Sequence, residues 1–322
     1  MQHEDAEIVA ADLVRALRGK LSRAAFSKRL GYRSNVVVRW ETKSAWPSAD
    51  VFFTRMGRAR PRAPQVLALF LGRSSAAAGT VSAADVASFL RELRGKTPLS
   101  LLAQRAGYSR FRVSRWLQGS TRPRLPEFLA MVEAATRRLL DLIALLTDPE
   151  RMPTVAPRYR ELQVARELAY DAPWSHAVLR TLELSDHPKK HQPQWIARRL
   201  GISVAEAEAG IAQLVRGGLA RRTGSRYRPT RVQLTDTRSD PVRALGLKAH
   251  WARTAVDRLA AGAPGGFGYS LFAVSRRDLQ RLRELHLEYV RAMQTVIAES
   301  QQPECVGLYC SQLVDLGEPR ES

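Results

Sequence analysis

The sequence predicts a mainly α-helical protein built from several small domains. Apolar residues recur every three or four positions through most of the chain, as in Val9, Leu13 and Leu17, which is typical of helices with one buried face. A segment of about forty residues is repeated within the first half of the chain, which indicates duplication of a folded unit. We therefore predict two tandem five-helix helix-turn-helix domains at residues 1–73 and 81–148, a winged-helix-like domain at 157–236, and a small α/β C-terminal domain at 239–318.

The two copies of the repeat are separated by a constant offset of 76 residues, without a gap. About a third of the aligned positions are identical, and they cluster at one turn and on one helix face. Within each copy a glycine, which tolerates positive φ, separates two short helices. In the second copy Ser109 can cap the helix that follows. The matching residues are Leu17 to Lys20 with Leu93 to Lys96, Gly31-Tyr32 with Gly107-Tyr108, Val37 with Val113, Arg39-Trp40 with Arg115-Trp116, and Pro47 with Pro123.

The second helix of the second copy has one apolar and one basic face. Val113 and Trp116 lie three apart and would pack against the preceding helix. Arg110, Phe111 and Arg115 then point outward, where such a helix meets a DNA major groove. Six arginines fall within residues 105–124, and no acid lies between Glu92 and Glu127, which suits a phosphate backbone. A solvated face on an ordinary helical bundle remains an alternative for this segment alone, and the second copy weighs against it.

This pattern resembles the phage-repressor-like helix-turn-helix family, also called Cro/C1 or XRE. That family has a glycine turn, a recognition helix, and a tryptophan or leucine before a polar loop and a proline. The second copy fits better, because the first has Glu41-Thr42-Lys43 where the second has Leu-Gln-Gly, and Val36 to Val38 leave fewer polar side chains to read bases. The resemblance implies five helices in each copy and a first recognition helix from Ser34 to Glu41.

Helical facing divides the candidate DNA-binding residues into two groups. The predicted base-reading residues are Ser34, Asn35 and Arg39 in the first copy, and Arg110, Phe111 and Arg115 in the second. The predicted phosphate contacts are Arg33, Lys43, Arg112, Arg122 and Arg124. Because one chain carries two recognition helices, a monomer would span two unlike half-sites and a dimer four.

Residues 157–236 have the pattern of a winged helix. Two short helices meet at Gly201, a longer helix runs from Val204 to Arg216, and a hairpin turns at Gly224-Ser225. The longer helix carries two glutamates, so a scaffold that positions the other domains is the alternative to DNA contact. The candidate wing contacts are Arg221, Arg222, Arg226 and Arg228.

The last eighty residues predict a helix at 240–259, a strand at 265–274, a long helix at 275–299 and a strand at 304–316. A strand-helix-strand unit cannot form a full sheet by itself, so other strands or a second subunit would complete it. This predicts a dimerisation or signal-input domain, with a second copy of the chain as partner.

Residues 165–317 also resemble a bacterial family of uncharacterised, presumed transcriptional regulators labelled DUF4423. The resemblance is carried by the stretch APWSHAVL at 172–179, by Lys248-Ala249-His250 with the run AVDRL at 255–259, and by CVGLY at 305–309. The sequence departs from the family by lacking its usual aromatic residue after Trp174. The resemblance implies a regulator with DNA-binding and winged-helix modules, without a ligand or reaction.

The composition favours an anionic partner and gives no support for an enzyme. Lys and Arg number 51 against 31 Asp and Glu, for a net charge of +20, and residues 1–236 hold nearly all of the excess. The only close histidine pair, His187 and His191, is interrupted by proline and lysines, so we predict no metal, cofactor or catalytic residue. Cys305 and Cys310 are interpreted as core thiols. No signal sequence or membrane span is evident, which predicts a cytoplasmic, nucleoid-associated protein.

The sequence therefore predicts a sequence-specific transcriptional regulator that binds double-stranded DNA. Two other classes remain open. One is a low-specificity nucleoid-associated protein, and the other is an antitoxin-like adaptor that binds a protein partner. The sequence identifies neither the operator nor a small-molecule or protein effector.

Overall fold

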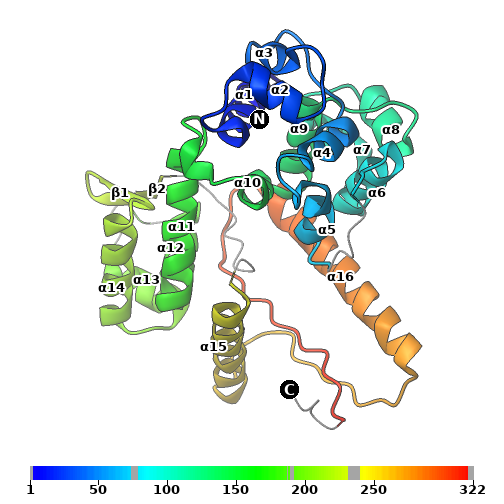
Figure 1. Ribbon diagram of the computed structural model, residues 1–322. Helices are drawn as coiled ribbons and strands as arrows, with labels where there is room; N and C mark the ends of the chain where they lie inside the picture. The colour runs from blue at the N-terminus through cyan, green and yellow to red at the C-terminus, as the bar shows by residue number, and fades with distance from the viewer. Residues whose placement is uncertain (1–2, 74–78, 187, 189–191, 231–239, 318–322) are drawn as a thin grey trace. The chain divides into compact units, whose positions relative to one another are not determined.

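The computed structural model describes residues 3–73, 79–186, 188, 192–230 and 240–317 (Figure 1). Sixteen α-helices and one two-stranded sheet make up the regular structure of these residues, which confirms the mainly α prediction. Contacts divide the chain into two compact units, residues 1–160 and 161–322. None of the helices described is both long and apolar enough to cross a membrane.

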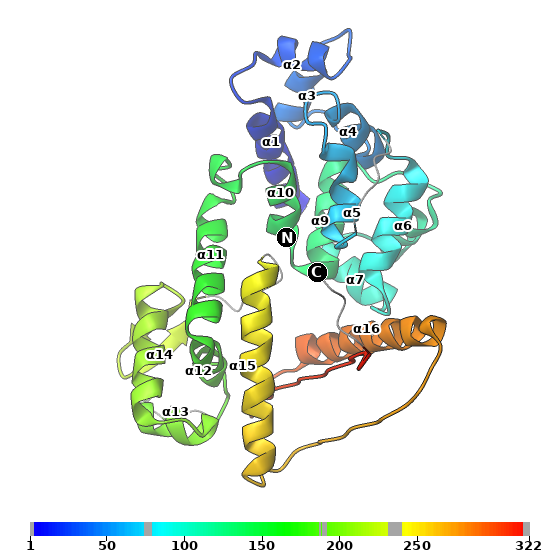
Figure 2. The same ribbon diagram turned by 60° about the horizontal axis from the view of Figure 1, so that its bottom comes forward.

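Both copies of the repeat lie in the first unit, and their helices follow in the same order. The first copy contains α1 (His3–Arg18), α2 (Arg23–Arg29), α3 (Val36–Glu41), α4 (Ala49–Met56), the 3₁₀ turn η1 (Ala63–Gln65) and α5 (Val66–Phe70). The second contains α6 (Ala83–Arg94), α7 (Leu99–Ala106), α8 (Arg110–Gln118), α9 (Leu125–Thr136), α10 (Leu139–Leu146) and η2 (Pro149–Arg151). α1 packs beside α9 (Figures 1 and 2).

A line of aromatic rings forms the core of this unit. Phe53 and Phe128 meet edge to face with ring centroids 5.4 Å apart, and Phe128 stacks on Phe89 at 5.7 Å. Phe70 also contacts Phe89, with ring centroids 5.9 Å apart. Phe53 and Phe70 belong to the first copy and Phe89 and Phe128 to the second, so the two copies share one hydrophobic core.

The second unit has its own core around a three-helix group and a hairpin. α11 (Ala156–Asp171) runs into this unit and is followed by α12 (Pro173–Thr181), α13 (Pro193–Leu200), α14 (Val204–Arg216), β1 (Ala220–Thr223) and β2 (Arg226–Pro229). β1 and β2 pair antiparallel, with Arg221 opposite Arg228. Val178, Ile196 and Leu214 are fully buried between α12, α13 and α14.

The C-terminal part contains two long helices, α15 (Pro241–Ala260) and α16 (Arg276–Glu299). Ser275 caps α16 by accepting a hydrogen bond from Asp278 N at 3.1 Å. The two strands predicted at 265–274 and 304–316 are wrong, because neither segment forms a strand. Each lacks the adjoining hydrogen-bonded strand that a ladder requires. The α/β character predicted for this region is therefore not found.

Apolar side chains in these extended segments remain exposed, including Tyr269 at 92 %, Leu271 at 79 % and Leu316 at 80 %. Cys305 is also exposed and Cys310 is half-buried, so the prediction of two core thiols is wrong. With no sheet to enclose it, most of the segment at 304–316 is exposed, although Val306 packs against the core of the second unit.

Because of a half-buried histidine on α12, we expect the second unit to lose stability in mild acid. His176 on α12 hydrogen-bonds the Ala165 carbonyl at 3.1 Å through Nε2, and burial lowers its pKa from the ordinary 6.5. A histidine with a lowered pKa in the folded state stabilises the fold above pH 6.5, and this contribution is lost as the pH falls toward the folded-state pKa. The protection factors for hydrogen exchange in α11 and α12 of the full chain, which correct for the intrinsic pH dependence of exchange, should fall between about pH 7 and about pH 5. The same fall in His176→Gln would contradict this assignment.

Candidate nucleic-acid interface

In the second copy, α7 and α8 meet at a tight turn with a buried aromatic anchor. Gly107 ends α7 with φ 74, and the next amide, Tyr108 N, bonds the Ala103 carbonyl at 3.1 Å. Ser109 then caps α8 by accepting from Arg112 N at 3.3 Å. The Tyr108 and Trp116 rings meet edge to face at 5.0 Å, and burial raises the Tyr108 pKa to about 12. These contacts hold one face of α8 against the domain.

The first copy repeats this geometry between α2 and α3. Gly31 has φ 82, and the Tyr32 and Trp40 rings meet edge to face at 5.7 Å. Tyr32 N bonds the Ser27 carbonyl at 3.0 Å. The same turn and the same aromatic pair thus orient α3 and α8.

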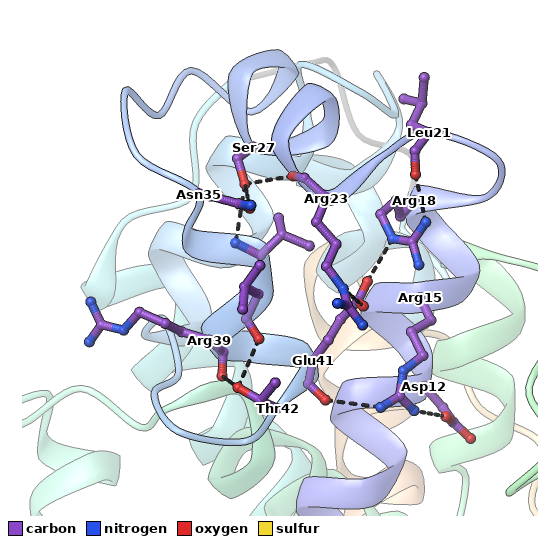
Figure 3. Close-up of polar contacts among 12 residues, drawn as sticks. Asp12, Arg15, Arg18, Leu21, Arg23, Ser27, Asn35, Arg39, Glu41 and Thr42 are labelled. Carbon is purple, nitrogen blue, oxygen red and sulfur yellow. Dashed lines mark hydrogen bonds and ion pairs between the residues drawn. The ribbon is translucent and has the colours of Figure 1, made fainter.

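The predicted start of α3 at Ser34 is wrong by two residues, because the helix begins at Val36 with Asn35 as its cap. Ser27 explains the late start (Figure 3). Its hydroxyl accepts from Val37 N at 3.1 Å, and its one proton can be donated either to the Arg23 carbonyl at 2.8 Å or to Asn35 Oδ1 at 3.2 Å. Asn35 therefore lies beside Ser27 at the turn, although its side chain is still exposed.

An arginine ties the carboxyl end of each of these helices to the first helix of its copy. Arg15 Nη2 donates to the Glu41 carbonyl at 2.9 Å, and Arg91 Nη1 donates to the Leu117 carbonyl at 2.7 Å. Helix ends leave unpaired carbonyls, so each bond satisfies one acceptor and orients the helix. Arg15 and Arg91 occupy equivalent repeat positions, and that identity was the signal that could have revealed them.

Glu41 is a buried charge that exists only in the first copy. Its side chain is 0 % exposed, and Arg18 Nε and Arg23 Nε donate to its two oxygens at 2.6 Å each (Figure 3). Burial raises the pKa of this carboxyl, but the arginine hydrogen bonds outweigh burial and leave the pKa below its ordinary 4.5. Glu41 therefore joins α1, α2 and α3. The second copy has the buried apolar Leu117 at this position.

The predicted base-reading residues all lie on the exposed side of α3 and α8 or at their first turn. Figure 3 shows the Arg39 guanidinium directed away from the buried cluster around Glu41. Phe111 is 72 % exposed, and the Arg115 guanidinium lies over its ring at 5.6 Å. Ser34 and Arg110 are exposed as well. An exposed phenylalanine stacked under an arginine places an apolar ring next to the planar guanidinium, whose N–H groups donate hydrogen bonds.

The five predicted phosphate contacts fall into two groups. Arg33, Lys43 and Arg124 are exposed, and the part of the chain that the structure describes shows no acidic partner for their side chains. Arg112 instead pairs with the buried Glu127 and lies over the rings of Tyr108 and Trp116 at 5.2 and 5.3 Å. Arg122 pairs with Asp50 of the first copy at 3.2 Å. These last two arginines also hold the fold together, which their sequence positions did not indicate.

In the second unit, three of the four hairpin arginines are exposed. Arg221 and Arg228 are directly opposite on β1 and β2, and like charges in such a pair repel unless an anion lies nearby. Arg222 Nε donates to the Gly224 carbonyl at 3.1 Å, and Arg226 is half-buried. Glu206 of α14 accepts from Ser203 N at 2.8 Å in a capping box, so this glutamate has a structural role at the helix start.

The comparisons with known proteins concern the second part of the chain. Residues 158–313, just under half of the sequence, match the model of a family described as a domain of unknown function, DUF4423. The match confirms the family name predicted for this segment. No curated protein and no solved structure matches the chain. Three parts of the prediction lie outside the described residues. They are the histidine pair at 187 and 191, residues 74–78 between the two predicted helix-turn-helix domains, and the domain boundaries placed at 236, 239 and 318.

Proposed function

We propose that this protein is a sequence-specific DNA-binding transcriptional regulator with two recognition helices, α3 and α8, in each chain. One observation carries the proposal. Two copies of the same turn, each with a buried tryptophan, present an exposed arginine at the same position, Arg39 in α3 and Arg115 in α8. Arginine forms two hydrogen bonds to a guanine edge in the major groove, which suits both residues to base reading.

The surrounding charge supports the same function. Arg33 and Lys43 flank α3, and Arg124 follows α8, all of them exposed. Cations placed at the two ends of a recognition helix contact phosphates and set its position on the duplex. We assign the same type of contact, more weakly, to Arg221 and Arg228 of the hairpin, so that the second unit acts as a winged helix on adjacent DNA.

Replacing Arg115 by Ala should weaken binding to the preferred duplex by about 1–3 kcal/mol and should relax specificity at one base pair. Arg151→Ala is the matched control, because it removes the same charge from an exposed position on η2. Dissociation constants would be measured for preferred and random duplexes at physiological salt. Equal losses on the two duplexes for Arg115→Ala would contradict base reading.

Replacing Arg124 by Ala should have a different signature. A lost phosphate contact weakens binding to all sequences alike and lowers the slope of log affinity against log salt by about one. Fluorescence anisotropy over a salt series would measure that slope. An unchanged slope, or a loss confined to one sequence, would contradict the phosphate assignment.

The full-length protein tests the proposed function directly against the two open alternatives. A preferred duplex should be bound at least about a thousandfold more tightly than random DNA. Strongly salt-dependent binding with a ratio near one would instead indicate a low-specificity nucleoid protein. No DNA binding, together with a stoichiometric protein partner, would indicate the adaptor.

A further inference from the structure

The two copies of the repeat are joined by a reciprocal pair of backbone hydrogen bonds. Ala49 N donates to the Pro123 carbonyl at 2.9 Å, and Leu125 N donates to the Pro47 carbonyl at 2.9 Å. Ser48 and Arg124 lie between them as an antiparallel bridge. Pro47 is the repeat equivalent of Pro123, and Ala49 is the equivalent of Leu125. Each hydrogen bond is therefore the image of the other under exchange of the two copies.

The helix contacts around this bridge show the same exchange. α4 contacts α6 of the other copy, and its equivalent α9 contacts α1. The equivalent helices α4 and α9 contact each other, and so do α5 and α10 (Figure 2). Contacts between a helix and its own equivalent, together with reciprocal contacts between unlike helices, are the mark of a two-fold interface. A simple head-to-tail repeat would join different surfaces of the two copies.

Both recognition helices lead through short, equivalent loops to this bridge. Ser48 follows α3 by one short loop, and Arg124 follows α8 by the equivalent loop. Equivalent backbone hydrogen bonds join each loop to its helix. Ser44 N donates to the Arg39 carbonyl at 2.9 Å, and Ser120 N donates to the Arg115 carbonyl at 3.0 Å. A pseudo-two-fold axis therefore relates α3 and α8 as two-fold mates, with the end of each helix leading to the bridge.

We propose that a single chain is a covalent pseudodimer whose DNA target is an inverted, imperfectly palindromic pair of half-sites. This inference rests on the proposed function. Two-fold related recognition helices read inverted half-sites, since operator symmetry mirrors protein symmetry. Arg39 and Arg115 are equivalent and identical, so the base pairs they read are related by the dyad. Ser34 and Asn35 are the repeat equivalents of Arg110 and Phe111. Because these residues differ between the copies, the bases next to those read by Arg39 and Arg115 should differ between the half-sites.

The experiment compares orientations of the same two half-sites. The preferred duplex is rebuilt with its half-sites inverted, in direct repeat, and inverted with about five extra base pairs, which turn one half-site to the opposite side of the duplex. The full-length chain should bind the inverted arrangement roughly 100-fold more tightly than the other two, because only there does one rigid unit engage both half-sites. The stoichiometry should be one chain for each inverted pair.

A substitution tests whether the bridge carries the preference. Ala49 is the first residue of α4 and follows Ser48, whose ψ of 153 suits a residue before proline. Ala49→Pro therefore keeps the helix and removes the hydrogen bond to Pro123. It should lower the preference for the inverted duplex by about tenfold or more. The control is Ala83→Pro, the same change at the first residue of α6, which also follows a serine with extended backbone but lies outside the bridge.

Equal affinity for the inverted and direct duplexes, or tolerance of the five added base pairs, would overturn the pseudodimer while leaving sequence-specific binding in place. Two chains on each inverted pair would overturn it as well. Failure to bind any duplex would overturn both this inference and the proposed function.

Discussion

Replacing Phe128 by Ala is expected to lower the free energy of unfolding of the first unit by about 3–5 kcal/mol. Phe128 is fully buried, and its ring contacts Phe53 of the other copy at 5.4 Å and Phe89 at 5.7 Å. The change removes apolar contacts and leaves a cavity at the junction of the two copies. Because the copies share this core, both should lose protection together in native-state hydrogen exchange of the full chain.

The control for this prediction is Phe111→Ala, the same chemical change at a side chain that is 72 % exposed. Surface substitutions usually change stability by less than about 0.5 kcal/mol, so the protection of the first unit should stay near its wild-type value. If Phe128→Ala reduced protection in the second copy and left α1 to α5 unchanged, the shared core would be refuted.

The second large effect is expected at the buried charge of the first copy. Arg18→Met should destabilise the first unit by about 2–3 kcal/mol, because it leaves the buried Glu41 carboxylate with Arg23 alone. Glu41→Leu should cost less than about 1 kcal/mol, because the two side chains it leaves unpaired, Arg18 and Arg23, are 21 % and 48 % exposed and can reach water. The second copy already accommodates Leu117 at this position.

Acid should abolish the contribution of this cluster. The folded-state pKa of Glu41 lies below 4.5, so its ion pairs stabilise the fold above that pH and are lost as the pH falls through the folded-state pKa. Urea midpoints measured near pH 7 and near pH 3 would compare wild type with Glu41→Leu. The wild type should lose more stability in acid than the variant, and equal losses would argue against the buried pair.

The repeat made the first unit largely predictable from sequence. The glycine turn, the Ser109 cap and the buried faces of α8 follow from local spacing, and the structure has them where the sequence placed them. The start of α3 was not predictable in this way, because it depends on a hydrogen bond from Val37 N to the hydroxyl of Ser27, a residue of the preceding helix. The partners of Arg112 and Arg122 were missed for the same reason, since both are tertiary contacts.

The C-terminal region was less predictable. The alternating apolar residues at 265–274 and 304–316 suggested strands, but a strand also requires a neighbour, and periodicity carries no information on whether one is present. The contact between the two copies could not be predicted from the sequence for a similar reason. Pro47 and Pro123 were visible as a repeated residue, but their reciprocal hydrogen bonds come from packing of the two copies.

The most direct test of DNA reading by two recognition helices is selection of bound sequences from random duplex DNA at physiological salt. The full-length protein would be compared with Arg39→Ala and Arg115→Ala. We expect one motif with two inverted arms, in which each variant degrades a single position and the two positions lie in different arms. Binding without an enriched motif, or a motif that both variants leave unchanged, would contradict it.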